Sequence, residues 1–535
     1  MLVWIWLGCL VTAIILYLWQ VYGFFKRRGV RTPKVIPPFG TIMKVVTRRN
    51  HFVEVLSEDY NKFSDQRFYG TFSFLKPIVY VRDIELIKKI VIKDFEHFLD
   101  HNHFFNEEFD QFFGKNLLSL KGQEWKDMRS TLSPAFTSSK MKMMLPLMVE
   151  VGDQMILSLK TKIKESKQGC LDIDVKNLTT RCANDVIASC AFGLKVDSHK
   201  DEDNQFYVMG KTASSAAFSF RQLINIFYRT LIPKAIAIFK FGRFPASVEN
   251  FFRSLVLETM QNRELQHIIR PDMIHLLMQV KKGKLAHEEK SSQDLSAGFA
   301  TVEESSVGQK EVNRVWSDDE LCAQATLFFV AGFETVSTMM AFLLHELAIN
   351  PDVQEKLYKE IKENEAKNNG KFDYNSIQNM VYMDMVVSET MRLWPSGFLL
   401  DRHCTKDYNL GKPNDAATED FIIRKGEALA INVWGIHHNP EYHPKPGKFD
   451  PERFSEENKH KIQPFTYMPF GLGPRNCIGS RFALCEVKVM VYQLLNSFEI
   501  SPSNRTSIPA KLDPASLSIY IKGGHWARFK TRKAL

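Results

Sequence analysis

The segment 317–349 constrains the fold of this chain more than any other feature, because it is apolar on nearly every side from Leu327 to Leu347. Ser317-Asp-Asp-Glu320 has the pattern of a capping box, in which a serine and a later glutamate bond the first free amides of a helix. The helix is expected to run to about Ile349 and to stop at Asn350-Pro351. A helix that is apolar all round must be buried in the core of a large protein. The rest of the chain is therefore expected to pack around it.

Size and composition agree with such a core. The chain has 535 residues, of which 44% are hydrophobic and 24% charged, as in a packed globular protein. These values exclude wholesale disorder, collagen and disulfide scaffolds, and a mean hydropathy of -0.21 argues against a polytopic membrane protein. The net charge of +9 suits an acidic partner or a membrane surface and does not require nucleic acid, which is not an expected partner. The eight cysteines are scattered without a Cys-x-x-Cys pair, as in a reducing compartment.

The N-terminus predicts a membrane anchor. Residues 1–25 contain no charged side chain, and Lys26, Arg27 and Arg28 follow directly. A cleaved signal peptide is the alternative, but its basic residues would precede the apolar run. The positive charge after the run places the remainder of the chain in the cytosol. We expect a single-pass anchor at 1–25, a basic and proline-rich linker at 26–40 and a globular domain at 41–535.

The remaining pattern predicts a mainly α fold with a minor β part. The expected helices cover Met141–Lys164, Leu178–Cys190, Pro351–Lys367, Ser376–Leu393 and Ser480–Ser497. The expected strands are a pair within Thr71–Val81 broken at Lys76-Pro77, a buried strand at Ala428–Val433 and a late strand at Ser516–Lys522. The polar stretch Gly283–Gln309 indicates a linker or a long surface loop.

The segment Phe470–Gly479, Phe-Gly-Leu-Gly-Pro-Arg-Asn-Cys-Ile-Gly, carries the clearest chemistry. Its glycines and proline permit a tight turn that backbone groups can approach closely. Cys477 lies just before the last expected helix, where amide groups and the helix N-terminus favour an anionic sulfur. Arg475 is placed to hold an anionic group beside it. An inert buried cysteine is the alternative for a cysteine taken by itself.

This segment resembles the haem-binding signature of the cytochrome P450 family, Phe-x-x-Gly-x-Arg-x-Cys-x-Gly, and matches it at every specified position. The resemblance implies a single large triangular domain that binds haem b, iron protoporphyrin IX. It makes Cys477 the axial ligand of the iron, with Phe470 and Arg475 as neighbours of the cofactor. A thiolate ligand pushes electron density toward the iron and favours O–O cleavage.

The long helix carries a second motif, Ala331-Gly-Phe-Glu-Thr335. Glu334 and Thr335 are costly inside so apolar a helix unless they are bonded or used. A threonine can also donate a hydrogen bond to the carbonyl four residues earlier, which would give Thr335 a structural role without a part in catalysis. The motif resembles the oxygen-binding segment of the same family, which implies that Glu334 and Thr335 deliver protons to oxygen. Val336 departs from the family, in which a hydroxyl residue is common there.

Two further motifs occur in the family's order. Glu389 and Arg392 are three residues apart on a helix and by themselves favour a weak surface pair. The resemblance implies instead a structural network with Arg453, which lies in a Pro-Glu-Arg-Phe element.

Trp125 and Arg129 lie one turn apart on a helix, where both could serve a carboxylate. The resemblance assigns them, together with Arg402, to a haem propionate. His101 is a further candidate, because related enzymes often have arginine at this place.

Aromatic and aliphatic side chains predict a large apolar pocket for a lipophilic molecule. Clusters of such side chains more often belong to the hydrophobic core, but the residues named here fall in the segments that bind substrate in the family. The expected lining residues are Phe104, Phe105, Phe112, Phe218, Phe328, Leu399 and Leu517.

The resemblance covers essentially the whole chain and is closest to microsomal, xenobiotic-metabolising enzymes, including insect detoxification enzymes. It implies a monooxygenase of the endoplasmic reticulum membrane that inserts one atom of O2 into xenobiotic or endogenous lipophiles. Electrons would come from NADPH through a flavoprotein reductase, with cytochrome b5 as a second candidate donor. A basic face is expected to dock the reductase, formed by Lys126, Lys140, Lys142 and Lys488.

Two other classes stay open at this stage. One is a haem-dependent isomerase or dehydratase that rearranges a peroxide without a reductase. Such relatives often lose the acid–threonine pair, which Glu334 and Thr335 retain here. The other is a non-catalytic haem protein, which the intact Cys477 loop argues against.

Overall fold

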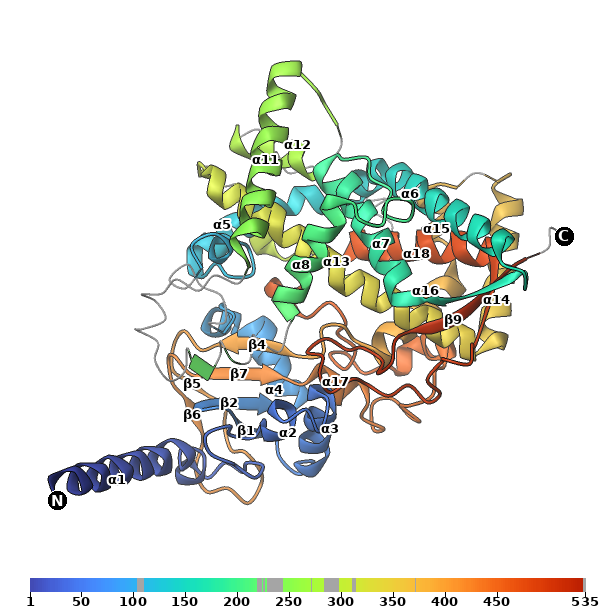
Figure 1. Ribbon diagram of the computed structural model, residues 1–535. Helices are drawn as coiled ribbons and strands as arrows, with labels where there is room; N and C mark the ends of the chain where they lie inside the picture. Colours follow the sequence, from blue (N-terminus) through green and yellow to red (C-terminus); the bar gives the residue numbers. More distant parts are fainter. Residues whose placement is uncertain are drawn as a thin grey trace.

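The computed structural model describes residues 1–102, 110–218, 224, 227–228, 244–270, 272–282, 298–309, 314–370 and 372–532. Helices make up most of the body, with β1 (Phe68–Ser73), β2 (Lys76–Val81), β4 (Leu400–His403) and β7 (Ala428–Ile431) on the side from which the N-terminal helix leaves and β9 (Trp526–Thr531) on the opposite side, near the C-terminus (Figure 1). The expected fold class, mainly α with a minor β part, is confirmed.

Helix α13, Asp318–Ile349, is the core of the body. It begins with the expected capping box, because Ser317 Oγ accepts from Glu320 N and the Glu320 carboxylate accepts from Ser317 N. Most of its side chains are buried. It packs against helices on several sides, namely α7 (Val175–Ile187), α8 (Gln205–Phe218), α11 (Ala246–Gln266), α16 (Val381–Leu393) and α18 (Ser480–Ser497).

The other helices can be compared with the helices expected from the sequence. The remaining α-helices of the described residues are α1 (Leu2–Tyr22), α2 (Met43–Val46), α3 (Phe52–Lys62), α4 (Ile84–Lys88), α5 (Gly122–Leu132), α6 (Ser138–Glu165), α12 (Met273–Lys281), α14 (Pro351–Lys367), α15 (Tyr374–Gln378) and α17 (Val433–His437). Helices α14 and α18 match the expectation at both ends, and α6 contains the expected segment 141–164.

Two helix predictions are wrong in part. The single helix expected at 376–393 is two helices, α15 and α16, because Met380 is extended (φ -78°, ψ 100°). The helix expected at 178–190 begins earlier, and its α-helical part ends at Ile187. A π-helical turn follows at Ala188–Phe192 and stops at Gly193, whose φ of +69° is left-handed.

The larger sheet has the strand order β1-β2-β7-β4, with β1 at Phe68–Ser73, β2 at Lys76–Val81, β7 at Ala428–Ile431 and β4 at Leu400–His403. The expected strand pair is confirmed, but its break is not at Lys76-Pro77. The turn is at Phe74-Leu75, where Phe74 has a φ of +54°. Pro77 lies within β2 but before the residues Ile78–Val81 that pair with β7, so it interrupts no bond to that strand.

A second sheet joins β3 (Cys170–Asp174), β9 (Trp526–Thr531) and β8 (Phe498–Ser501), and β5 (Tyr408–Asn409) pairs with β6 (Ile422–Ile423). The late strand expected at 516–522 is wrong, because that stretch contributes only the isolated bridge between Leu512 and Ile521. The strand forms at β9 instead, where β3 and β8 pair with it on both edges.

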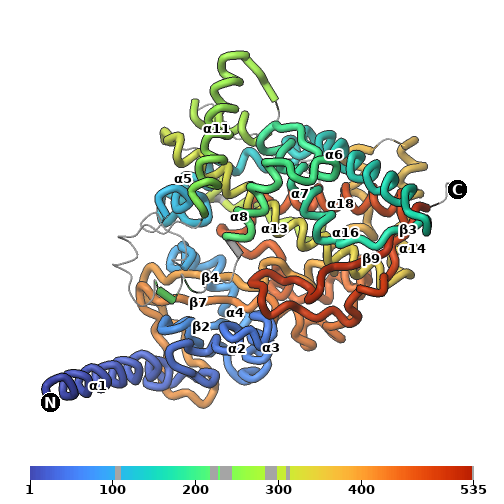
Figure 2. Tube along the Cα trace, in the orientation of Figure 1, coloured from blue at the N-terminus to red at the C-terminus, as the bar shows by residue number. Residues whose placement is uncertain are grey.

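Helix α1 is long and apolar enough to cross a membrane and is exposed along its length. Figure 2 shows it leaving the body on the side of β2. Its end is fastened to that sheet: Tyr22 Oη donates to Phe74 O (3.3 Å), and the fully buried Phe25 ring lies 5.2 Å from Phe72. Helix α13 also has the length and composition of a span, but most of it is buried in the core.

Candidate functional site

The loop before α18 is tightly folded around Cys477. Cys477 N donates to Phe470 O (2.8 Å), which closes the loop between the first and the eighth residues of the motif. Gly473 has a φ of +70°, and a Cβ there would lie 1.9 Å from Val91 O. The loop therefore requires glycine at this position, because backbone from another segment lies against it.

The Cys477 thiol is accessible, although it lies deep in the molecule. Desolvation raises the pKa of this thiol, whereas the Gly479 N–H and the charge of Arg129 lower it. The effect of burial is the larger one, so the pKa is raised overall, and the loop by itself does not favour an anionic sulfur as the sequence led us to expect. A bound metal cation deprotonates a coordinating thiol outright, which suits an accessible sulfur in this setting.

Arg475 contacts several preceding residues, with Nη2 3.6 Å from Asp100 Oδ1, and its expected hold on an anionic group beside Cys477 stays a prediction. Its guanidinium donates to the main-chain oxygens of Leu99 (2.7 Å), Leu117 (3.3 Å) and Leu120 (2.8 Å). It also lies 4.0 Å above the ring of Trp125, whose side chain is buried. Arg475 thus fastens the loop to two preceding segments.

Arg129 of α5 binds the same loop from the other side. Its Nη1 donates to Asn476 O (2.7 Å) and its Nη2 to Asn476 Oδ1 (2.7 Å). The guanidinium also forms a bidentate pair with Glu304, with Nη2–Oε2 at 2.6 Å and Nε–Oε1 at 3.1 Å. The role at a haem propionate that the resemblance implies for Trp125 and Arg129 stays a prediction.

Arg402 and His101 lie at the edge of the larger sheet. His101 Nδ1 contacts Asp401 Oδ1 (3.0 Å), and Arg402 Nη1 donates to Asp401 O (2.7 Å). Within the described residues this is the only hydrogen bond that the Arg402 guanidinium donates, although the side chain is buried. Burial lowers the pKa of Arg475, and the charge of Arg402 lowers it further, so the two cations lie near each other.

These features fit the cofactor that the resemblance implies. The buried Arg402 guanidinium can donate further hydrogen bonds, and a haem carboxylate is an acceptor that suits it. The accessible Cys477 thiol supplies a ligand for its iron.

The oxygen-side motif lies on α13. Ala331 and Thr335 are exposed, although the helix around them is otherwise largely buried. Thr335 Oγ1 donates to Ala331 O (2.6 Å), which is the local bond considered from the sequence. Because the hydroxyl proton is used in this bond, the Thr335 oxygen is left as an acceptor on the accessible surface.

Glu334 belongs to a polar cluster and, among the described residues, makes no hydrogen bond to the Thr335 side chain. Its carboxylate accepts from Ser214 Oγ (2.9 Å) and Thr338 Oγ1 (3.3 Å) and pairs with Lys176 Nζ (3.3 Å). Lys176 comes from α7 and also donates to Ser337 Oγ (2.7 Å). Burial lowers the pKa of Lys176, and the Glu334 carboxylate opposes this shift.

Side chains connect the two halves of the site. Ser396 Oγ donates to Thr335 O (3.3 Å), and a Cβ on the next residue, Gly397, would lie 3.8 Å from Pro469 O, just before the cysteine loop. The residues after α16 therefore contact both α13 and the cysteine loop. On another side, the ring of Phe328 packs 5.5 Å from Phe136.

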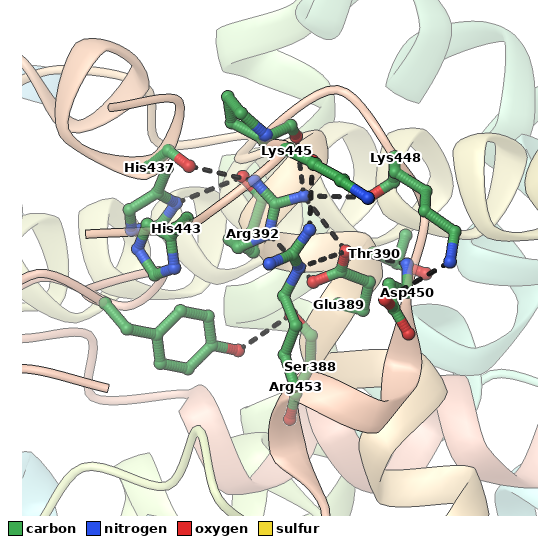
Figure 3. A network of polar contacts seen from close by, with 12 residues as sticks. Ser388, Glu389, Thr390, Arg392, His437, His443, Lys445, Lys448, Asp450 and Arg453 are labelled. Carbon is green, nitrogen blue, oxygen red and sulfur yellow. Dashed lines mark hydrogen bonds and ion pairs between the residues drawn. The ribbon is translucent and has the colours of Figure 1, made fainter. Parts of the chain in front are cut away.

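Glu389, Arg392 and Arg453 converge, as the resemblance implies. Figure 3 shows them with the chain around His437 and Lys448. Arg392 Nε donates to Glu389 Oε2 (2.8 Å) and Arg453 Nε to Glu389 Oε1 (3.3 Å). Arg392 also donates to His437 O (2.8 Å), and the side chains of Glu389 and Arg392 are fully buried. The weak surface pair suggested by the spacing alone is therefore not what forms.

The expected pocket residues are distributed among several elements. Phe104 and Phe105 lie outside the described residues, as does the side chain of Phe218. Phe112 is buried in the main core, and partial burial is found for Phe328, Leu399 and Leu517. Their role in binding a substrate stays a prediction.

The expected basic face needs a correction. Lys488 is fully buried, with Nζ 3.1 Å from Asp384 Oδ1 and 3.3 Å from Gln378 Oε1, so its placement on a docking surface is wrong. The helix pattern alone did not reveal that α15 and α16 cover this side of α18. Lys126 pairs with Glu96 (2.7 Å) at the surface, and Lys142 is exposed above the Tyr374 ring.

Three residues of this site were not singled out from the sequence. Asn476 was an unspecified position of the cysteine motif, and Lys176 lay just before the helix expected at Leu178–Cys190 and gave no signal of its own. Glu304 lay in a stretch that the composition indicated as linker. The structure packs part of that stretch, residues 298–309, against the body.

Comparisons with known proteins agree with the geometry. The family model described as Cytochrome P450 matches residues 30–526. The chain is 42% identical over 522 residues to "Cytochrome P450 9e2" of Blattella germanica, covering 96% of this chain and 94% of that protein. It is 38% identical to "Probable cytochrome P450 9f2" of Drosophila melanogaster, covering 98% of both chains. It is 37% identical to "Probable cytochrome P450 6a13" of the same species, covering 94% of this chain and 93% of that protein.

Proposed function

The chain belongs to the cytochrome P450 family of haem-thiolate monooxygenases, and from this we propose that it inserts one oxygen atom of O2 into lipophilic small molecules. In this proposal the second oxygen atom is reduced to water, and the electrons come from NADPH through a flavoprotein reductase. The accessible Cys477 thiol, in a loop held by Phe470, Arg129 and Arg475, is the observation that carries it.

Bound haem b would supply the activation of O2, with its iron held by Cys477. Arg402 offers unused donors to a carboxylate of the cofactor, and Trp125 and Arg129 are the further propionate residues of the proposal. Arg475 contributes indirectly, since its bonds to Leu99 and Leu120 keep the cysteine loop in place.

On the oxygen side, Thr335 and Glu334 would manage protons. The Thr335 oxygen can accept a bond from water while its own proton is held by Ala331 O. Glu334 pairs with Lys176 at 3.3 Å and directly precedes Thr335 on the helix, which places its carboxylate next to the accessible helix face.

The substrate would be a xenobiotic or an endogenous lipophile. The segments expected to line the pocket are aromatic and aliphatic, namely Phe104, Phe105, Phe112, Phe218, Phe328, Leu399 and Leu517. An apolar pocket selects ligands by shape and burial, which is compatible with a broad range of substrates.

We place the enzyme in the endoplasmic reticulum membrane as a single-pass protein with its catalytic domain in the cytosol. The exposed apolar helix α1 supports the anchor, and Lys26–Arg28 directly after it support the orientation. The division into anchor 1–25, linker 26–40 and monooxygenase domain 41–535 is part of this proposal.

The reductase, and cytochrome b5 where it takes part, would dock on the side of Cys477. With Lys488 buried, the basic residues of this surface are Lys126, Lys140 and Lys142. Opposite charge would steer an acidic donor toward it.

A reconstitution experiment tests the function. Full-length protein is combined with NADPH, a reductase and a library of lipophilic compounds, and products are screened for one added oxygen atom. We expect NADPH consumption that depends on substrate, together with oxygenated product. Turnover of a lipid peroxide without reductase would support the isomerase class, and the absence of both reactions would support a haem protein without catalytic activity.

A further inference from the structure

Residues 298–309, which we call the strap, cross the cysteine side of the molecule. At the first end, Phe299 N donates to Asp384 Oδ2 (2.8 Å) of α16, and the Phe299 ring packs 5.1 Å from Phe454. At the second end, a Cβ on Gly308 would lie 2.6 Å from Ser133 Oγ, just after α5. The strap therefore bridges two elements that are far apart in the sequence.

The middle of the strap contacts the residue that precedes Cys477. Asn476 Nδ2 donates to Glu303 O (3.0 Å). Arg129 then connects the carboxylate of Glu304 to Asn476, because one guanidinium binds both, with Nη2 at 2.6 Å from Glu304 Oε2 and 2.7 Å from Asn476 Oδ1. The strap holds Asn476 both directly and through Arg129.

Burial makes this arrangement depend on Glu304. The Arg129 side chain is only 3% exposed, and a charge that is buried without a partner is strongly unfavourable. Glu304 is 25% exposed, so it reaches the surface while it pairs with the buried cation. Ala300 and Val307 are buried in the main core and hold the strap on either side of this pair. The neighbouring Glu303 has an exposed side chain and uses its main-chain oxygen.

We propose that Glu304 is a positioning residue for Cys477: it neutralises Arg129, keeps Asn476 in place and closes the strap over the cysteine side against water. This inference rests on the proposed role of Cys477 as iron ligand. It gives Arg129 a function in holding the strap, in addition to any contact with a propionate.

The test compares two adjacent glutamates. Glu304→Gln keeps the size of the side chain and removes the charge, and Glu303→Gln makes the same change where the carboxylate is exposed. The haem-loaded, full-length variants are reduced under carbon monoxide, and the loss of the absorption band that marks thiolate ligation is followed with time. We expect this loss to be roughly tenfold faster in Glu304→Gln, since the buried Arg129 has lost its anionic partner on the strap. Glu303→Gln should behave as the wild type.

Varying the salt concentration distinguishes the effect of the Glu304 charge from the effect of its side-chain shape. Because Glu304 is partly exposed, raising the ionic strength should accelerate the loss of the band in the wild type. Glu304→Gln should respond little, and Glu304→Asp should retain most of the wild-type behaviour, which keeps the test informative if the glutamine variant folds poorly.

Hydrogen exchange of the haem-free full chain provides a readout that does not depend on ligation. Amides of 298–309 and 122–132 should exchange faster in Glu304→Gln than in Glu303→Gln. Equal band loss and equal exchange in the two variants would overturn the proposal. A wild type that never forms the band would refute the ligand role of Cys477 instead, and the exchange comparison would still decide whether Glu304 holds the strap.

Discussion

Thr335 on α13 is held by a carbonyl only four residues away, whereas Arg475 on the cysteine side bonds carbonyls of Leu99, Leu117 and Leu120, which lie in other segments. The oxygen side is a regular helix, in which backbone N–H and C=O groups bond one another. The polar side chains of its motif are not needed to form this helix. The cysteine side is a loop without regular backbone hydrogen bonding, so its conformation depends on hydrogen bonds between side chains and segments that are distant in the sequence. Changes on α13 should therefore impair function before folding, and changes on the cysteine side should impair both.

The largest effect is expected for Cys477→Ala. Without a thiolate ligand, the variant should lose the ferrous–carbon monoxide band that marks thiolate ligation entirely. Cys170→Ala, which changes a partly exposed cysteine on β3, is the control and should keep the band. A normal band in Cys477→Ala would show that another residue binds the iron.

The next largest effect should come from Arg392→Leu, which leaves the buried carboxylate of Glu389 without this partner. Breaking a buried pair by removing one member costs about 3–5 kcal/mol. The matched control is Lys362→Leu, which removes a pair with the same spacing to Glu365 in a half-exposed setting. We expect that change to cost about 0–1 kcal/mol. Chemical unfolding of both variants measures the difference, and equal losses would contradict the structural role of the buried pair.

Thr335→Ala tests the oxygen side directly. The free energy of unfolding should change by less than about 0.5 kcal/mol, because the backbone of α13 does not need the hydroxyl. Product formed per NADPH should fall, with more peroxide released, since a positioned proton donor or acceptor is typically worth ~10²–10⁴-fold in rate.

Thr326→Ala is the matched control for this prediction. Thr326 is buried on the same helix and makes the same type of bond, to Cys322 O (2.9 Å). Its removal should leave the yield per NADPH unchanged. If Thr335→Ala also kept the wild-type yield, the proton role of Thr335 would be refuted.

A smaller effect is expected from Glu346→Gln near the end of α13. Burial raises the pKa of Glu346 to about 7, although bonds from Trp394 and Asn350 oppose the shift. The folded protein thus holds this proton at pH values where the unfolded chain has released it. Its contribution to stability is complete below the unfolded pKa and is lost as the pH rises through about 7.

Chemical unfolding over a range of pH checks this sign. Relative to Glu346→Gln, the wild type should lose on the order of 1–3 kcal/mol as the pH rises from about 5 to about 8. A difference between the two proteins that stays constant with pH would show that Glu346 does not titrate in this range.

The smallest effect should come from reversing the charge of Lys126, Lys140 and Lys142 to glutamate. Reductase-driven turnover should slow roughly tenfold at low salt and depend less on ionic strength, since electrostatic steering is lost. Peroxide-driven turnover should hardly change. Lys530→Glu, an exposed position on β9, is the control. Equal losses in both assays would indicate damaged haem binding, and no loss would place the docking surface elsewhere.

The accuracy of the sequence-based predictions follows the same division between local and distant contacts. The bounds of α14 and α18 were predicted because proline, capping residues and apolar periodicity are local signals. The break at Met380 and the placement of β9 were missed, because a strand or a helix break depends on partners that are not adjacent in the chain. Lys488 looked like a surface lysine for the same reason: Asp384 and Gln378 lie in other helices.

The sequence by itself determined the family, the mainly α class, the buried helix α13 and the identity of Cys477 as the candidate ligand. Each of these depends on a motif or a periodicity contained in one short stretch. Tertiary structure alone decided that Glu389 and Arg392 form a buried network, that Lys176 holds Glu334 and that Glu304 meets Arg129 across 175 positions of chain. Charges acquire such roles only when folding removes them from water, and which partner then neutralises each one depends on segments that the local sequence does not contain.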